Sequence, residues 1–397
     1  MSDLKIFTNV IDDQALSQIN TLISQPAFAD CKVRIMPDVH AGAGCVIGFT
    51  ADLGDKVIPN IVGVDIGCGM LTVNLGNINI DFEAFDSVIC NYIPAGRNAH
   101  AAPTYSSKAF KQLYCYDALK NREWIRKSLG TLGGGNHFIE VDVDSQGNKY
   151  LVIHSGSRNL GKQVAEYYQS LAVASMEHKD LLPALQKQLI TNLKAQGRQS
   201  EISQVIKDLR NAFNGIQSDV PKELSYLTGA NRDAYLHDMQ ICQEFASANR
   251  LMMADVICSH MGWSMNNWFE TIHNYIELET NMVRKGAISA KLGEKVLIPI
   301  NMRDGSILAV GKGNDDWNCS APHGAGRLMS REQAKAQVLL EDYQQSMEGI
   351  YTTSVNMSTL DEAPMVYKSL SDIVDNIGDT VEVIEVIKPI YNFKASE

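Results

Sequence analysis

The feature that most constrains the fold of this 397-residue chain is a set of cysteine and histidine side chains in glycine-rich or turn-like segments. The set comprises Cys68, His137, His154, His273 and His323. Glycine beside such a side chain lets the backbone bend sharply and approach a metal ion or a phosphate without a Cβ clash. If the set forms one site, segments from residue 65 to residue 323 must converge. We therefore expect one compact α+β domain over residues 1–397, with mixed β-sheets surrounded by helices.

The composition, 45% hydrophobic and 20% charged, is ordinary for a globular protein with a substantial core. Apolar runs stay short of the roughly 20 residues that span a bilayer, so we expect no membrane association. The eight cysteines lie far apart without a CxxC pair, which favours a reduced, cytoplasmic setting. The net charge of -11 argues against a nucleic-acid coat protein. A nucleic-acid enzyme with a local basic channel or bound cations stays possible.

Local patterns predict several elements. They are a helix over residues 13–23, a strand from Lys32, a helical segment over about residues 161–275, strands and tight turns over residues 283–310, a helix over residues 331–348 and a strand from Val381. The basic stretch from Lys108 to Lys127 favours a solvated helix face over an RNA track. Internal repeats and linkers are absent from the sequence, which agrees with one domain.

The residues themselves indicate a metal site. Asp65 and Cys68 share one turn, and His154 ends the apolar run Tyr150-Leu-Val-Ile153. Thiolate and imidazole suit Zn, Mn, Fe or Co, whereas a carboxylate favours harder divalent ions. Each histidine taken singly fits a satisfied core residue equally well, and the set as a whole favours ligands. Asp38, beside His40, is a candidate for orienting a ligand or a nucleophile.

His323 differs because Gly324, Ala325, Gly326 and Arg327 follow it and a helix is expected from Leu328. Backbone N–H groups at a glycine turn that opens a helix form an anion site, and arginine can clamp a phosphate. A histidine held against a bound phosphate can be its nucleophile. The alternative is that His323 only caps or packs the turn.

Motifs along nearly the whole chain resemble the RtcB family of RNA-splicing and RNA-repair ligases. They are Met36-Pro-Asp-Val-His40, Gly63-Val-Asp-Ile-Gly-Cys-Gly69, Gly135-Asn-His-Phe138, His154-Ser-Gly-Ser-Arg158, Arg284-Lys-Gly-Ala287, His323-Gly-Ala-Gly-Arg327 and Asp361-Glu-Ala-Pro364. The resemblance implies an RtcB-like α+β fold and a GTP- and manganese-dependent ligase. Such an enzyme joins an RNA 3'-phosphate or 2',3'-cyclic phosphate to a 5'-hydroxyl through a histidine–GMP intermediate and an RNA 3'-guanylate anhydride.

The resemblance also implies roles for individual residues. Cys68 would bridge two Mn²⁺ ions, one held with Asp65 and His137 and the other with His154 and His273. His323 would be guanylylated, with Asp38 and Asn136 as further catalytic residues. The remaining nucleotide contacts would come from Asn136, Glu140, Asn301, Ser306, Gly324, Ala325, Gly326, Arg327, Tyr367 and Lys394. The implied partners are GTP and broken RNA ends, such as tRNA halves or damaged rRNA, bound by a monomer; an activating protein is compatible with the sequence.

The segment Pro299-Ile-Asn-Met-Arg-Asp-Gly-Ser306 departs from the family pattern, Pro-Gly-Ser-Met followed by small residues. Asn301 replaces the family's first serine, and Arg303 and Asp304 replace small residues expected near the nucleotide phosphates. We therefore expect a divergent member with intact catalytic groups. Two alternatives remain open, a dinuclear-metal phosphodiesterase or phosphatase and an RNA-binding repair factor with a degenerate site. Neither needs His323, Glu140 and Lys394 for covalent nucleotide chemistry.

Overall fold

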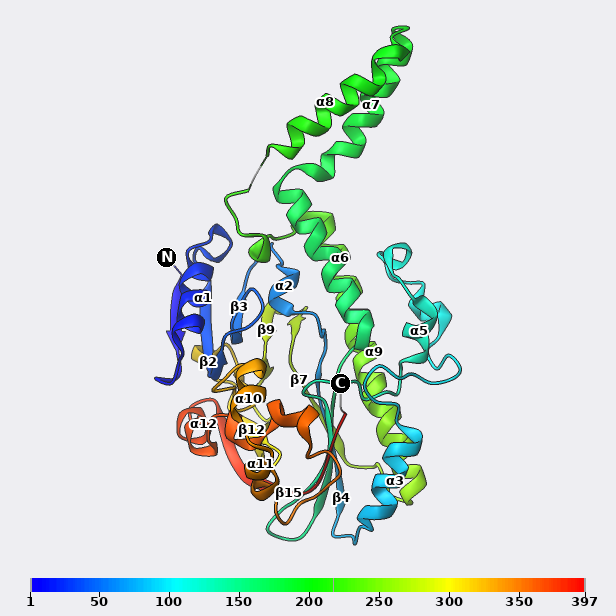
Figure 1. Ribbon diagram of the computed structural model, residues 1–397. Coiled ribbons are helices and arrows are strands. Elements are labelled where there is room, and N and C mark those ends of the chain that lie inside the picture. The colour runs from blue at the N-terminus through cyan, green and yellow to red at the C-terminus, as the bar shows by residue number, and fades with distance from the viewer. Residues whose placement is uncertain (1, 217, 396–397) are drawn as a thin grey trace.

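Eight strands form the largest sheet of the computed structural model, which describes residues 2–216 and 218–395 (Figure 1). In spatial order they are β11 (Lys295–Asn301), β12 (Gly305–Gly311), β15 (Val381–Lys394), β5 (Phe138–Val143), β6 (Lys149–Ser155), β4 (Gly69–Gly76) and β7 (Trp268–Ile272), with β14 (Tyr351–Thr352) pairing β15. The strand expected from Val381 is present and runs on to Lys394. Because β15 pairs antiparallel with β5, the end of the chain lies beside residues 138–143.

Two smaller sheets complete the β-structure of the described residues. The first has the order β1 (Asp3–Ile6), β2 (Lys32–His40), β3 (Ile47–Asp52), β9 (Met282–Lys285) and β8 (Tyr275–Glu277), and the second pairs β10 (Ala287–Ser289) with β13 (Ser320–Pro322). The strand expected from Lys32 is therefore nine residues long, and residues 33–39 are buried. A buried strand of this kind is covered on both faces, and it places Asp38 inside the protein.

Helices pack against the sheets, with α9 (Gly229–Met261) on β4 and β6 and α1 (Asp13–Ile23) and α12 (Leu370–Ile377) on β2. The helices before residue 280 are α1 (Asp13–Ile23), α2 (Pro59–Val62), α3 (Phe82–Tyr92), α4 (Ser107–Phe110), α5 (Arg122–Lys127), α6 (Arg158–Met176), α7 (Leu182–Ala195), α8 (Ile202–Asn214) and α9 (Gly229–Met261). One core cluster joins Met253 and Ile257 of α9 to Leu71 of β4 and Ile153 of β6. This packing fixes the strands that carry the candidate metal ligands. None of the described helices has the length and apolar character needed to cross a membrane.

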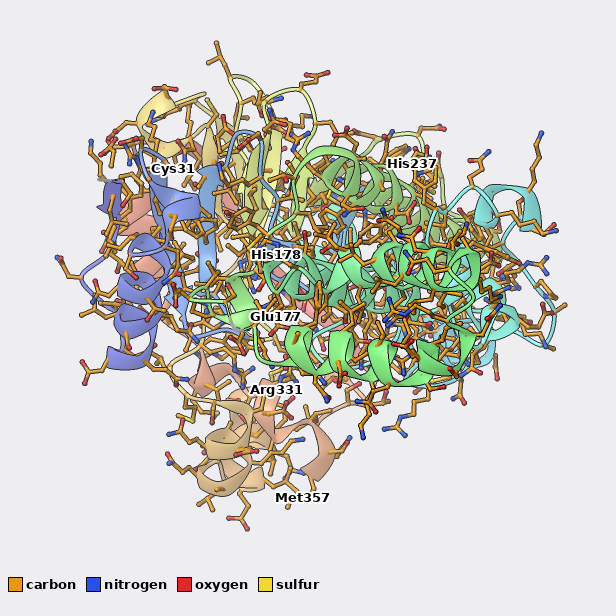
Figure 2. The ribbon with its side chains drawn as sticks, turned by 90° about the horizontal axis from the view of Figure 1, so that it is seen from above. Cys31, Glu177, His178, His237, Arg331 and Met357 are labelled. Carbon is orange, nitrogen blue, oxygen red and sulfur yellow. The ribbon has the colours of Figure 1, made fainter. Side chains whose placement is uncertain are left out.

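The helical hairpin α7–α8 projects from the rest of the protein (Figure 1). Seen from above, Glu177 and His178 lie near the end of α6, where the chain turns toward the hairpin (Figure 2). The segment expected to be helical over about residues 161–275 contains α6 to α9, but its last part is not helical. Trp268–Ile272 is strand β7, because its two aromatic and two β-branched residues favour a strand, and it pairs with β4.

The C-terminal third carries short helices around the large sheet. They are α10 (Arg331–Gln337), α11 (Leu340–Ser346) and α12 (Leu370–Ile377), with a 3₁₀-helix at Met357–Glu362. The expectation of one helix over residues 331–348 is wrong, because Val338 is extended and separates α10 from α11. Ala334 and Tyr343 would lie on opposite faces of a straight helix, whereas the break lets both enter one core cluster. Likewise, the basic stretch from residue 108 to residue 127 is not one helix: it is α-helical only at its ends, with a 3₁₀-helix at Tyr116–Ala118 between them.

Candidate active site

The predicted metal ligands converge at one end of four neighbouring strands, β5, β6, β4 and β7. In antiparallel strands the beginning of one strand lies beside the end of the next. His137 directly precedes β5, His154 lies near the end of β6, Cys68 directly precedes β4 and His273 directly follows β7. The order of strands in the sheet therefore brings these four residues together.

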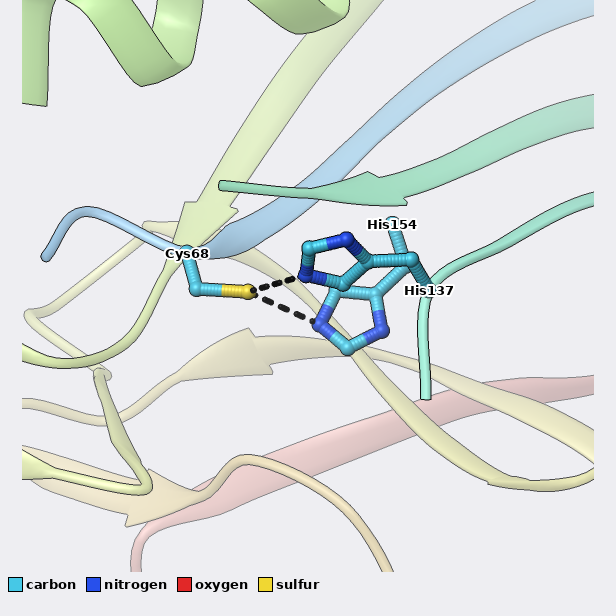
Figure 3. Close-up of side chains that lie close together, drawn as sticks. All are labelled: Cys68, His137 and His154. Carbon is cyan, nitrogen blue, oxygen red and sulfur yellow. Dashed lines mark hydrogen bonds between the residues drawn. The ribbon is translucent and has the colours of Figure 1, made fainter. Parts of the chain in front are cut away.

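Cys68 lies in the middle of the cluster. Its Sγ atom faces the imidazoles of His137 and His154, at 3.5 Å and 3.2 Å from their Nε2 atoms (Figure 3). The Nε2 atom of His273 lies 3.4 Å from Nε2 of His154, and Oδ2 of Asp65 lies 2.9 Å from Nε2 of His137. The cysteine and the three histidines are buried, and Asp65 is half-buried. The five predicted ligands thus form one connected group.

Backbone carbonyls orient two of the imidazoles. Nδ1 of His137 lies 2.8 Å from the carbonyl oxygen of Leu132, and Nδ1 of His154 lies 3.1 Å from that of Asn136. A ring nitrogen next to a carbonyl oxygen donates its proton, so Nε2 of His154 keeps a lone pair directed into the cluster, whereas both nitrogens of His137 face oxygen atoms. This is the tautomer of a metal-ligating histidine whose second nitrogen is hydrogen-bonded. For His273, Nδ1 is buried and has no partner among the described residues.

The carboxylate of Asp65 is held in place and ionised, as a ligand for a cation must be. Its Oδ1 atom accepts the backbone N–H of Ser157 at 3.0 Å. Burial acts to raise the pKa of Asp65, but the hydrogen bond and charge of His137 outweigh it and lower the pKa to about 2. A Cβ at Gly156 would lie 2.1 Å from Oδ1 of Asp65, so only glycine permits this approach.

The cluster fits a divalent cation. Burial, followed by the negative charge of Asp65, raises the pKa of the Cys68 thiol well above its ordinary value. Burial also lowers the pKa values of His154 and His273 well below theirs, with a neighbouring histidine adding to each effect. Neutral imidazole lone pairs, a thiol and an ionised carboxylate that face one another form a donor set for Mn, Zn, Fe or Co. Binding of a cation would displace the thiol proton.

Next to the cluster, His323 is held by a fully buried carboxylate. Its Nδ1 atom lies 2.6 Å from Oδ2 of Asp38, which also accepts the backbone N–H of His323 at 3.1 Å. The ring centroid of His323 lies 4.8 Å from that of His273. With the Nδ1 proton donated to Asp38, the Nε2 lone pair remains available, as a nucleophile requires.

The glycine turn after His323 depends on its lack of side chains. At Gly326, where φ is 78°, a Cβ would lie 2.2 Å from the backbone oxygen of Asp38. The turn can therefore pack directly onto the strand that carries Asp38. The expected helix starts three residues later than the sequence suggested, since α10 begins at Arg331 with Ser330 as its N-cap. Residues 324–330 line a cavity instead.

At the far side of the cavity, Lys394 forms a buried ion pair with Glu362, Nζ to Oε2 at 2.6 Å. The hydroxyl of Tyr367 donates to the same oxygen at 2.7 Å, and Arg327 donates to that hydroxyl at 3.2 Å. Arg331 approaches Oε1 of Glu362 at 3.3 Å. Burial acts to raise the pKa of Glu362, but Lys394 and Arg331 hold it below its ordinary value.

A second buried carboxylate, Glu140, lies on β5 opposite Asn392 of β15. Nδ2 of Asn392 donates to Oε2 of Glu140 at 2.5 Å. The ammonium of Lys394 lies over the ring of Phe138, 5.5 Å from its centroid. Acidic and basic groups are thus gathered around one end of the cavity, a chemistry suited to the polar edge of a purine base.

The cavity has a volume of about 1000 Å³, enough for a nucleotide. Predicted site residues that line it are Asp65, Cys68, Asn136, Glu140, His154, His273, Asn301, His323, Gly324, Ala325, Gly326, Arg327, Tyr367 and Lys394. Asp38, His137 and Ser306 lie behind this surface. The candidate metal ligands, His323 and the charged group around Lys394 therefore meet at one cavity.

A family model described as tRNA-splicing ligase RtcB matches residues 18–395. The chain belongs to the RtcB family. RNA-splicing ligase RtcB1 of Escherichia coli strain ATCC 25922 and RNA-splicing ligase RtcB of E. coli strain K12 are each 28% identical to it, over 96% of this chain and 94% of theirs. The tRNA-splicing ligase RtcB of Archaeoglobus fulgidus is 26% identical over 92% of this chain and 87% of its own. The resemblance seen in the motifs is confirmed, as is the α+β class.

The segment that departs from the RtcB pattern forms the turn between β11 and β12. Oδ1 of Asn301 accepts the backbone N–H groups of Arg303 and Asp304 at 3.0 Å and 2.9 Å. The guanidinium of Arg303 pairs with Asp304 at 2.9 Å, and neither side chain lines the cavity. The two charged side chains therefore pair with each other in the turn and lie outside the cavity lining.

Two further residues of the candidate site, Glu362 and Asn392, were not predicted from the sequence, although Glu362 belongs to the motif Asp361-Glu-Ala-Pro364. Asn392 lies two positions before Lys394 in a strand, so both side chains point to one face of the sheet. That spacing is a signal that could have identified Asn392. The pairing of Glu362 with Lys394 depends on tertiary structure and left no signal in the local sequence.

Proposed function

We propose that this RtcB-family RNA ligase joins an RNA 3'-phosphate or 2',3'-cyclic phosphate to a 5'-hydroxyl, using GTP and two Mn²⁺ ions. We further propose that the whole chain forms one catalytic domain, since candidate residues from Asp38 to Lys394 share one site. The observation that carries the proposal is the hydrogen bond between Nδ1 of His323 and Asp38 at 2.6 Å, beside the ligand cluster. A nucleophile, a group that orients it and a metal site are then combined in one cavity.

In the first step, Nε2 of His323 attacks the α-phosphorus of GTP. The new N–P bond replaces the bond to pyrophosphate, which leaves. Asp38 accepts a hydrogen bond from Nδ1 and stabilises the positive charge that develops on the imidazole, as in other histidine–carboxylate pairs. The 2.6 Å distance supports this role, because a charge-assisted hydrogen bond is short.

Cys68 would hold both metal ions, one together with Asp65 and His137 and the other with His154 and His273. The chemistry such ions supply is neutralisation of the negative charge on phosphate oxygens. The support for this assignment is the inward direction of the Nε2 lone pair of His154, the contact of His137 with Asp65 and the low pKa of Asp65. The bridging position suits Cys68 because its sulfur lies within 3.5 Å of histidines on both sides.

The nucleotide would lie along the cavity from His323 to Lys394. Glu140 and Lys394 would contact guanine, and Arg327 and Tyr367 would line its path. Asn136, Asn301 and the turn Gly324–Gly326 would contact the phosphates, because backbone N–H groups at a glycine turn bind anions. Ser306 would act from behind the cavity surface, since its side chain is fully buried.

The remaining steps transfer the guanylate. A 2',3'-cyclic phosphate end is first hydrolysed: water adds to the phosphorus and the P–O2' bond breaks, which leaves a 3'-phosphate and a 2'-hydroxyl. The RNA 3'-phosphate then attacks the phosphorus of the histidine adduct, which restores His323 and forms an RNA–guanylate anhydride. The 5'-hydroxyl of the second RNA end then attacks the 3'-phosphate and releases GMP. The substrates would be broken RNA ends, such as tRNA halves. The names of the relatives, RNA-splicing and tRNA-splicing ligases, support this choice of substrate.

A joining assay tests the proposal. The protein is incubated with one oligoribonucleotide that ends in a 2',3'-cyclic phosphate and a second that begins with a 5'-hydroxyl. GTP is compared with ATP, and Mn²⁺ with Mg²⁺ and Zn²⁺. We expect a joined product that requires GTP and Mn²⁺. Hydrolysis of the cyclic phosphate without GTP and without joining would contradict the proposal and favour a phosphodiesterase, whereas binding without turnover would favour an RNA-binding factor.

A further inference from the structure

Asp142 is a buried carboxyl group that the proposed mechanism does not use. It lies two residues after Glu140 on β5, so both side chains point to the same face of the sheet. It is fully buried, lies behind the cavity surface, and is flanked on the adjacent strands by Tyr150 and Pro389. A carboxyl group in such apolar surroundings has no access to solvent that could stabilise a charge.

The group that Asp142 faces is the carboxyl of Glu140. Neither oxygen of Asp142 has a donor within hydrogen-bonding distance among the described residues. Glu140 projects from the same face of β5 two residues away, so its carboxyl is the acceptor within reach of a protonated Asp142. Two carboxyl groups can face one another in this way only if one of them carries a proton. The pair therefore holds a shared proton.

The surroundings decide which carboxyl keeps that proton. Glu140 accepts the N–H of Asn392 at 2.5 Å and lies near the positive charge of Lys394. The positive charge that acts on Asp142 is that of Lys388, whose ammonium donates to the backbone oxygen of Asp304 at 3.1 Å. Burial raises the pKa of both groups, and the charge of Glu140 raises that of Asp142 further. The proton thus belongs on Asp142, and Glu140 is the ionised member.

The ionisation of Glu140 has a consequence for base recognition. The edge of guanine offers two donors, N1–H and the N2 amino group, which an ionised carboxylate can accept together. Adenine offers one donor beside the N1 lone pair, so it fits a protonated carboxyl better than an ionised one. A site built around one hydrogen-bonding pattern rejects a ligand that leaves a group unpaired. The state of Glu140 therefore selects between the two bases.

We propose that Asp142 is a neutral acid that donates a hydrogen bond to Glu140 and so keeps Glu140 ionised and oriented for guanine in preference to adenine. Asp142 is then a positioning residue for base selectivity, acting through Glu140 without touching the nucleotide. The inference rests on the proposed role of Glu140 as a guanine contact.

Equilibrium binding of GMP and AMP, measured by calorimetry, tests the selectivity without requiring covalent transfer. The variants are Asp142→Asn, whose amide can donate as the acid does, and Asp142→Leu, which cannot donate. We expect Asp142→Asn to keep the preference for GMP and Asp142→Leu to lose about tenfold or more of it. Unchanged selectivity in Asp142→Leu, or an equal loss in both variants, would overturn the inference while leaving the ligase proposal intact. Failure of the unaltered protein to prefer GMP would contradict the guanine role of Glu140 itself.

Infrared spectroscopy tests the shared proton directly, even if a variant folds poorly. Protein labelled with ¹³C at aspartate carboxyl groups should show, at neutral pH, the carbonyl band of a protonated carboxyl. We expect this band to be missing from Asp142→Asn and to persist in Asp55→Asn, which alters an exposed aspartate. Absence of the band from the unaltered protein would overturn the inference whatever the outcome of the joining assay.

Discussion

Nδ1 of His323 and Oδ2 of Asp38 lie 2.6 Å apart, although the two residues are separated by most of the chain. The same carboxylate oxygen accepts the backbone N–H of His323. Asp38 therefore fixes both the position of the residue and the tautomer of its ring. Gly326 makes the arrangement possible, since a side chain there would collide with the backbone of Asp38.

Replacing Asp38 by asparagine should slow guanylylation by about 10²- to 10⁴-fold, because an amide does not hold the proton on Nδ1 or stabilise a charged ring. The rate of protein labelling by GTP carrying label on its α-phosphate measures this. Metal content should not change, since Asp38 is not a proposed ligand. Asp55→Asn, in an exposed ion pair with Lys56, serves as the matched control and should label normally. Normal labelling of Asp38→Asn would refute the orienting role.

Binding of Mn²⁺ should release about one proton per protein at pH 8. The Cys68 thiol, with its raised pKa, is protonated at that pH, whereas Asp65, with a pKa of about 2, is already ionised. His154 and His273 are neutral because their pKa values are lowered. The affinity for metal should accordingly rise about tenfold per pH unit. Calorimetry in buffers of different protonation enthalpy measures the release, which Cys68→Ala should abolish together with bound metal. Full metal content in Cys68→Ala would exclude the bridging role.

Glu362 should make the protein sensitive to acid. Its folded-state pKa lies below the ordinary 4.5 of an unfolded glutamate, so its contribution is fully present above pH 4.5. The contribution is lost as the pH falls from 4.5 through the folded-state value. Glu362→Gln should be about 3–5 kcal/mol less stable at pH 7, because Lys394 loses its buried partner, and should show a flatter pH dependence below 4.5. Urea unfolding at several pH values, with the exposed Glu341→Gln as control, would detect a failure of either expectation.

Removing the charged pair at the β11–β12 turn should have little effect on catalysis. Arg303→Ala and Asp304→Ser should change stability by less than about 1 kcal/mol and leave the labelling rate within about twofold. Asn301→Ala should lower the stability by more than either of these substitutions, because Asn301 accepts two backbone N–H groups and donates to Asp304. Labelling rates and thermal unfolding measure both. A large loss of GTP-dependent labelling in Arg303→Ala would show that the guanidinium acts on the nucleotide after all.

Elements with strong local signals could be predicted from the sequence. The helix over residues 13–23 begins at an aspartate N-cap, whose side chain accepts the N–H of Ala15, and both of its ends match the prediction. The alternation after Val381 likewise identified β15. The break at Val338 could not be predicted, because it arises from the packing of α10 and α11 against one core cluster.

The residues of the candidate site could be predicted from sequence motifs, but not from the spacing of the residues alone. Cys68 and the histidines share no fixed interval, and only the order of strands in the large sheet brings them together. The placement of Asn392 opposite Glu140 depends on the register between β15 and β5. A motif likewise does not reveal that the Arg303 side chain turns toward Asp304 of its own hairpin.

The most direct test of the account is the covalent bond to His323. The protein is incubated with Mn²⁺ and GTP labelled on the α-phosphate, and the adduct is mapped by proteolysis and mass spectrometry. We expect an acid-labile guanylate on His323, absent from His323→Ala, with the metal content of that variant unchanged. An adduct that persists in His323→Ala, or no adduct on the unaltered protein, would contradict the account.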